Sequence, residues 1–154
     1  MEAAKGAFPD TREVALTAAI FRIPTNADNQ VLPNDRDQLR AKGYLFAEGT
    51  RNSYDPAFAP NGDLISADNG PDADYPDELN WLRAGYHYGF PWRLGNVDNA
   101  TRSPDYDPSK DKWLPSEYYA TKQGLYYADL TFPPPPAGVT FTDPIPNFGP
   151  DADE

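Results

Sequence analysis

The chain has 154 residues with 18 prolines and 11 glycines, and its apolar fraction of 39% lies below the roughly 45–50% of ordinary domains. Loops are therefore expected to occupy much of it. An excess of 24 acidic over 13 basic residues gives a formal charge of −11, which repels nucleic acids and anionic lipid heads. The absence of cysteine excludes disulfides and thiolate-ligated metals, and no stretch approaches the ~20 apolar residues of a membrane span.

The N-terminal part of the sequence predicts little regular structure. Residues 1–12 show no periodicity and are expected to be flexible, and nothing there has the charged and apolar regions of a signal peptide. Residues 13–23 fit a short helix by their alanines or a strand by their alternation. We expect a strand at 19–23, because Pro24 would end it. After a loop, residues 35–43 predict a single helical turn with Gly43 at its end.

Residues 44–92 carry most of the functional signal. Two apolar runs, YLFA and DLISA, flank the Asn61-Gly62 pair. Both residues tolerate the positive φ of a tight type I′ turn, so the pair predicts a β-hairpin. Phe58 and Leu64 are expected to face each other across its ladder.

Loop-forming residues dominate the sequence after the second apolar run. The Gly70-Pro71 step should end regular pairing and leave carbonyl oxygens free to bind, within an acidic loop that runs from DNGPD to DELN. A polar loop is expected at 95–111. Residues 112–131 are aromatic and predict either packing over a core edge or an irregular strand. The FPPPPAGV run at 132–139 predicts a rigid polyproline II loop, after which a strand-like pattern restarts.

Four of these pieces occur in a recognisable order: RN at 51–52, NGDL at 61–64, DNGPD to DELN at 68–80, and GYHYGFPW at 85–92. Together they resemble the soluble PQQ-dependent sugar dehydrogenases and their glucose/sorbosone dehydrogenase relatives. The resemblance covers about a third of the chain. It implies an all-β fold, a six-bladed propeller of antiparallel blades, and a periplasmic or secreted location.

The length limits how much of such a propeller the chain can form. A blade takes about 40–45 residues in the best-known repeat family, so 154 residues predict an incomplete propeller of about two blades. We expect one partial domain over 1–154, with its motif-bearing core at 44–92 and a loop-rich extension at 93–154. Unclosed blades expose strand edges, which favours self-association.

The resemblance implies that Arg51, Asn52 and Asn69 contact the cofactor PQQ. Arginine presents a rigid fork of donors that suits the carboxylates and quinone oxygens of this tricarboxylate. The alternative is a turn with a surface salt bridge. The chain departs from the family pattern directly afterwards, with Ser53 in place of the usual proline and Asp55 in place of the usual glycine. A carboxylate beside an anionic cofactor is unfavourable.

A calcium site is implied by the same resemblance, through the main-chain oxygens of Gly70 and Pro71. Asp72, Asp77 and Glu78 add carboxylates in the same short loop. Like charges at this spacing raise one another's pKa unless a cation or hydrogen bonds intervene, and carboxylates suit calcium. The alternative is that these side chains hold the loop by bonds to the backbone.

His87 is the only histidine. In the resembled enzymes the general base is a histidine upstream of the Arg-Asn motif, and no histidine precedes Arg51 here. His87 instead falls in the GYHYGFP packing motif, so a structural role is predicted. Loss of a general base costs typically 10²–10⁴-fold in rate. The sequence therefore assigns no catalytic residue, and the isolated chain is a poor candidate for a competent dehydrogenase.

Three functions remain open on the sequence alone. The first is part of a PQQ- and calcium-dependent dehydrogenase that oxidises a sugar hydroxyl to a lactone. The second is a calcium-dependent lactonase- or esterase-type propeller hydrolase, with Asn and acidic side chains holding the metal. The third is a non-catalytic acidic module that binds carbohydrate or protein through its tyrosines.

Overall fold

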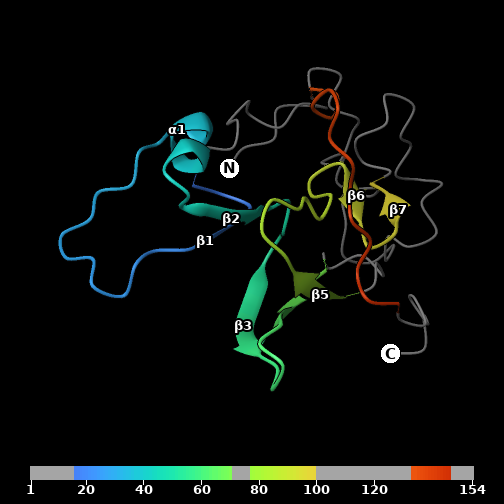
Figure 1. Cartoon of the computed structure of the whole chain (residues 1–154). Helices are drawn as coiled ribbons and strands as arrows, with labels where there is room; N and C mark the ends of the chain where they lie inside the picture. Colours follow the sequence, from blue (N-terminus) through green and yellow to red (C-terminus); the bar gives the residue numbers. More distant parts are fainter. Residues whose placement is uncertain (1–15, 71–76, 100–132, 147–154) are drawn as a thin grey trace, which may run out of the picture.

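The computed structural model describes residues 16–70, 77–99 and 133–146 (Figure 1). Its elements are, in chain order, β1 (Ala19–Phe21), α1 (Arg36–Ala41), β2 (Leu45–Glu48), β3 (Ser53–Phe58), β4 (Leu64–Asp68), β5 (Glu78–Leu82), β6 (Arg93–Leu94) and β7 (Val97–Asp98). The predictions for residues 1–12, 112–131 and the Pro71-Asp72 step lie outside the described residues. Within the described part, no helix is long and apolar enough to cross a membrane.

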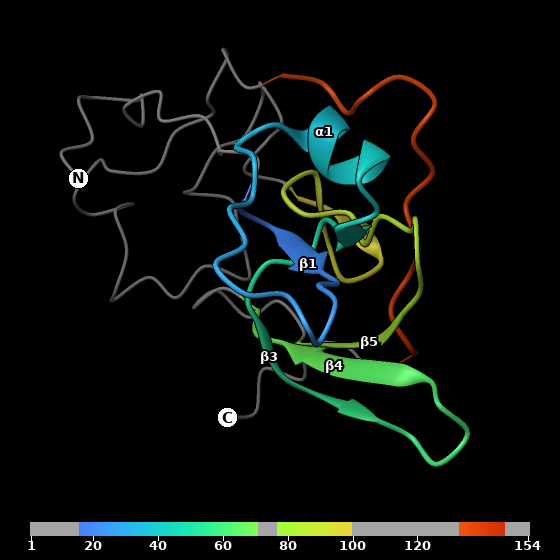
Figure 2. The same ribbon diagram turned by 60° about the vertical axis from the view of Figure 1, so that its left-hand side comes forward.

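The strands form three antiparallel sheets, ordered β1-β2, β3-β4-β5 and β6-β7. The all-β class is therefore confirmed, with one six-residue helix in the described part of the chain. Figure 2 shows β3, β4 and β5 side by side as one sheet whose β3-β4 hairpin projects from the body. Each sheet of the described residues is open and antiparallel, as the separate blades of a propeller are.

The β3-β4 hairpin forms where the sequence predicts it. Phe58 pairs with Leu64, which confirms the expected register. The type I′ turn is wrong, because only Gly62 has a positive φ, of 90°. The amide of Gly62 instead donates to the carbonyl of Ala59 at 2.8 Å. The loop is thus longer, with Pro60 in a position that suits its fixed φ and glycine in the left-handed conformation before β4.

Polarity changes along the inner face of the three-stranded sheet. The cross-strand pairs on this face of β4 and β5 are Leu64 with Leu82, Ser66 with Asn80, and Asp68 with Glu78. The apolar end belongs to the hydrophobic core, which is formed around Ala47, Leu82 and Tyr88. The polar end lies beside the start of β3. The same face of the sheet therefore packs the core at one end and presents buried polar groups at the other.

Strand β5 was expected to be part of a polar loop. Its residues alternate between buried and exposed, with Glu78, Asn80 and Leu82 turned inward. The polar residues are tolerated inside because Glu78 accepts hydrogen bonds from the amide of Gly95 at 2.5 Å and from Asn80 Nδ2 at 2.9 Å. These partners belong to the folded structure, so the sequence pattern alone favours a loop.

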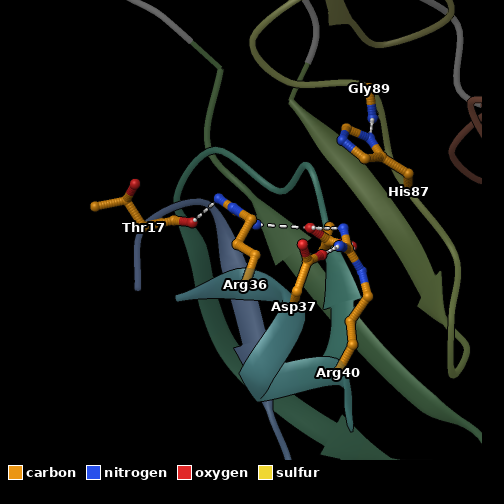
Figure 3. Close-up of polar contacts among 7 residues, drawn as sticks. Thr17, Arg36, Asp37, Arg40, His87 and Gly89 are labelled. Carbon is orange, nitrogen blue, oxygen red and sulfur yellow. Dashed lines mark hydrogen bonds and ion pairs between the residues drawn. The ribbon is translucent and has the colours of Figure 1, made fainter. Parts of the chain in front are cut away.

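The predicted helical turn is confirmed as α1. The Asp35 carboxylate caps it by accepting from the amide of Gln38, and Gly43 follows with a φ of 71°. Arg36 and Arg40 reach from the helix to one carboxylate, that of Glu48 in β2, at 2.7 and 2.8 Å (Figure 3). The helix is thereby held on the two-stranded sheet β1-β2.

The described C-terminal segment, residues 133–146, crosses the body without joining a sheet. The amide of Thr142 donates to the carbonyl of His87 at 2.7 Å, and that of Ile145 donates to the carbonyl of Leu79 at 2.8 Å. Figure 2 shows this segment, drawn in red, reaching the level of β5. These two hydrogen bonds hold residues 133–146 against β5 and against the residues that follow β5.

Candidate functional site

The Arg-Asn corner, by which we mean Arg51 and Asn52, lies between β2 and β3. Its backbone is fixed by one carboxylate, that of Asp68 at the end of β4. Asp68 Oδ2 accepts the amide of Arg51 at 2.8 Å, and Oδ1 accepts the amide of Asn52. The carbonyl of Asn52 in turn accepts the amide of Asn69 at 3.2 Å. The corner is therefore tied to the end of the neighbouring strand at three points.

The side chain of Arg51 continues along the same strand end. Its Nη1 donates to the carbonyl of Asn69 at 2.8 Å and to that of Gly70 at 2.6 Å. The structure thus brings the Arg-Asn corner to the same strand end as the Asn69-Gly70 step, which the resemblance assigns to the cofactor and to calcium. Arg51 and Asn52 are exposed, and the remaining donors Nε and Nη2 of Arg51 bond to no described residue. They are placed to receive an anion.

Two buried carboxyl groups lie side by side beneath this corner. Asp68, with 2% of its surface exposed, is paired across the strands with Glu78. Burial raises the pKa of Asp68, and the hydrogen bonds from the amides of Arg51 and Asn52 oppose this effect. Burial also raises the pKa of Glu78, and the nearby Asp68 carboxylate adds to the rise.

The acidic loop is held by side-chain bonds to the backbone where the structure describes it. Asp77 Oδ1 accepts the amide of Gly70 at 2.6 Å. Both oxygens of Glu78 are engaged, by the amide of Gly95 and by Asn80. Glu78 thus lies inside the sheet rather than in an open loop. Asp77 links the strand end at Gly70 to the start of β5.

In the described part of the expected calcium site, the carbonyl oxygen of Gly70 faces a competing positive charge. The carbonyl oxygen of Gly70 already accepts the positively charged guanidinium of Arg51, and like charges on one oxygen repel each other. Pro71 and Asp72 lie outside the described residues. Among residues 16–70, 77–99 and 133–146, no group of three or more His, Asp or Glu side chains is arranged to hold a metal.

PQQ suits the donor groups of the corner. Its carboxylates need exposed donors, and Nε and Nη2 of Arg51, which have no partner among the described residues, supply a fork of N–H groups. Asn52 is exposed at the same corner and adds an amide. The residues present are therefore compatible with an anionic cofactor.

The backbone conformation at Asp55 shows what the usual glycine of the family pattern would do at this position. Its φ is 47°, a left-handed conformation that glycine adopts without strain. The pairing of β3 with β4 shifts its register between Tyr54 and Ala57, on either side of Asp55. The backbone thus forms a bulge whose conformation suits glycine, and aspartate adopts this conformation at a cost in folding free energy.

His87 packs against two aromatic rings and close to Gly49, two residues before Arg51. Its ring lies 5.1 Å from that of Phe141 and 5.8 Å from that of Trp92, measured between centroids. Nδ1 accepts the amide of Gly89 at 3.1 Å (Figure 3). A Cβ added at Gly49 would lie 2.2 Å from the same nitrogen. These contacts agree with the predicted structural role.

Asp68 is the functional candidate that the sequence did not single out. It ends the apolar run of β4, where an acidic residue is easily read as the first residue of a loop. The available signal was its position at the end of the strand, directly before Asn69-Gly70. A carboxylate that is buried there must accept hydrogen bonds from nearby donors.

Comparison with known proteins places the chain in a family. The Glucose / Sorbosone dehydrogenase family profile matches residues 17–134, more than half of the chain. The chain is 37% identical over 76 residues to quinoprotein glucose dehydrogenase B of Acinetobacter calcoaceticus, a match that covers 49% of this chain and 15% of that protein. The chain belongs to the glucose/sorbosone dehydrogenase family, and the resemblance found in its sequence is confirmed.

A solved structure also matches in part. It is the PQQ-bound form of the aldose sugar dehydrogenase of Streptomyces coelicolor, with 24% identity and a TM-score of 0.38. The match covers 53% of this chain and 22% of that one. The chain therefore spans a small part of the length of the relatives it matches.

Proposed function

We propose that the chain forms part of a PQQ-dependent sugar dehydrogenase and that the Arg-Asn corner binds the cofactor. The observation that carries the proposal is the contact of the Arg51 guanidinium with the carbonyls of Asn69 and Gly70. This contact joins the two family motifs at one strand end. The family of the chain and the quinoprotein named among its relatives support the choice of cofactor.

Each corner residue has a distinct part in this proposal. Arg51 donates the N–H groups of its Nε and Nη2 to an anionic group of the cofactor, and Asn52 adds an amide beside it. Asn69 contributes a contact through its exposed side chain, because its carbonyl is already bonded to Arg51. PQQ, when bound, supplies the two-electron acceptor for oxidation of a sugar hydroxyl to a lactone.

The proposal assigns no general base from this chain. The only histidine, His87, is engaged at Nδ1 by the amide of Gly89 and packs against two aromatic rings. An exported location, periplasmic or secreted, belongs to the same proposal and is supported by the family resemblance.

PQQ binding tests the proposal directly. We expect PQQ to quench tryptophan fluorescence on titration, and Arg51→Ala to weaken the affinity by about 10- to 100-fold, the range that follows from loss of a charge-assisted bond worth ~1.5–3 kcal/mol. Arg22→Ala is the matched control, because it removes the same charge from a side chain that lies over the Phe46 ring. Equal losses in the two variants, or no binding by the native chain, would refute the proposal.

A further inference from the structure

We infer that Asp68 is the positioning residue of the cofactor corner. Its carboxylate sets the backbone of Arg51 and Asn52, and so the direction in which both side chains leave the chain. This inference rests on the proposed function where it concerns PQQ. Its geometric part concerns the protein alone.

The hydrogen bonds of Asp68 are the first reason. One oxygen accepts the amide of Arg51 at 2.8 Å and the other accepts the amide of Asn52. A carboxylate presents two acceptor oxygens and no donor. Two consecutive amides that point to one side are therefore satisfied by a single group.

The location of Asp68 is the second reason. It is 2% exposed, whereas Arg51 and Asn52 are exposed. It ends β4, the central strand of its sheet, with Ser53 of β3 and Glu78 of β5 as its cross-strand partners. The group that fixes the corner is thus held in the sheet and cannot itself reach a ligand above the corner.

The remaining contacts of Arg51 come from the same short segment. Asp68 holds its amide, and the carbonyls of Asn69 and Gly70 hold its guanidinium. Three consecutive residues therefore hold both ends of one arginine. Such a support restricts the side chain to one direction before any ligand binds, which is the preorganisation that improves affinity.

The Asp68→Asn substitution removes one hydrogen-bond acceptor without changing the size of the side chain. The Asp68→Asn side chain has the same shape but one acceptor oxygen, and its NH₂ group would face a second N–H donor. One of the two amides then loses its partner. We expect the corner to become mobile while the sheet around it persists.

The first experiment measures PQQ affinity in a double-mutant cycle. We expect Asp68→Asn to weaken binding at least tenfold in the native background and at most threefold in an Arg51→Ala background, because most of the effect passes through the arginine and the remainder through Asn52. Glu48→Gln is the control, since it removes a carboxylate bonded to Arg36 and Arg40. An equal loss in both backgrounds would overturn the inference.

The second experiment needs no cofactor. Hydrogen exchange of the full chain, resolved by NMR, should show the amides of Arg51 and Asn52 protected in the native protein. In Asp68→Asn they should exchange at least tenfold faster relative to the amides of β5, a local change that general destabilisation would not produce. Unprotected amides in the native protein would overturn the inference even if the variant fails to fold.

The two experiments keep the proposals distinct. If the native chain binds no PQQ but the two amides are protected through Asp68, the proposed function fails and the positioning stands. If PQQ binds and the amides are unprotected, the function stands and the positioning fails.

Discussion

Arg51 donates its Nη1 to the carbonyl oxygen of Gly70 at 2.6 Å, although the two residues lie 19 positions apart in the sequence. This contact places a positive charge on an oxygen that the family resemblance assigns to calcium. It makes the corner attractive to anions and unattractive to cations as long as the arginine stays there.

Calcium binding in the absence of PQQ should therefore improve when Arg51 is removed. Arg51→Ala frees the carbonyls of Asn69 and Gly70 and removes the repelling charge. Calorimetric titration with calcium chloride should give a lower dissociation constant for this variant than for the native chain. Arg22→Ala should leave it unchanged. Tighter binding by the native chain would contradict this interpretation of the contact.

Glycine at position 55 should stabilise the protein. Asp55 has a φ of 47°, and relief of a left-handed conformation is worth on the order of 1 kcal/mol. Urea unfolding of Asp55→Gly should show a higher midpoint. Asp37→Gly makes the same chemical change in α1, where glycine costs roughly 0.5–1 kcal/mol, and should lower it. A lower midpoint for both variants would show that the strain is not relieved.

Alanine at position 49 should be strongly destabilising. Gly49 has a φ of 73°, and a Cβ there would lie 2.2 Å from His87 Nδ1 and 2.8 Å from the amide nitrogen of Gly89. We expect a loss of more than about 2 kcal/mol, because strain and overpacking add. Gly43→Ala is the matched control, with a φ of 71° and nothing within 4 Å, so it carries the strain alone. Similar losses in both variants would exclude the predicted clash.

Stability should fall as the pH is lowered towards the folded-state pKa of His87. Burial lowers this pKa from 6.5, Glu48 opposes the shift, and Arg36 and Arg40 add to it. The unfolded chain then binds the proton more readily, so protonation favours unfolding. The free energy of unfolding should decrease as the pH falls through about 6.5 and level off below the folded pKa.

Urea unfolding between pH 8 and pH 5 checks this sign. His87→Gln should remove the part of the pH dependence that lies in this window, even though it lowers stability at every pH. An unchanged slope in the variant would assign the dependence to other groups.

Local signals in the sequence predicted local structure well. The Asn61-Gly62 pair and the apolar runs around it were sufficient for the hairpin and its register, because these depend on neighbours along the chain. The turn type was wrong, since Pro60 fits a longer loop closed by Gly62 alone. The helical turn ending near Gly43 followed from the same kind of signal.

Tertiary partners account for what the sequence did not predict. Strand β5 was taken for a loop because nothing in its residues shows that the amide of Gly95 would satisfy Glu78. The role of Asp68 depends on two amides 16 and 17 positions away. By contrast, Arg51 and Gly70 were both assigned functional roles from the family motifs, and their contact across 19 positions could not be read from spacing.

If the Arg-Asn corner and the Gly70 step form one cofactor site, both should respond together when PQQ binds. The most direct measurement is the change of ¹⁵N chemical shifts in the full chain on titration with PQQ. We predict that the signals of Arg51 (including its side-chain Nε), Asn52 and Gly70 shift together with one dissociation constant, while those of β6 and β7 stay in place. Shifts at Arg51 without any at Gly70, or shifts confined to other parts of the chain, would contradict it.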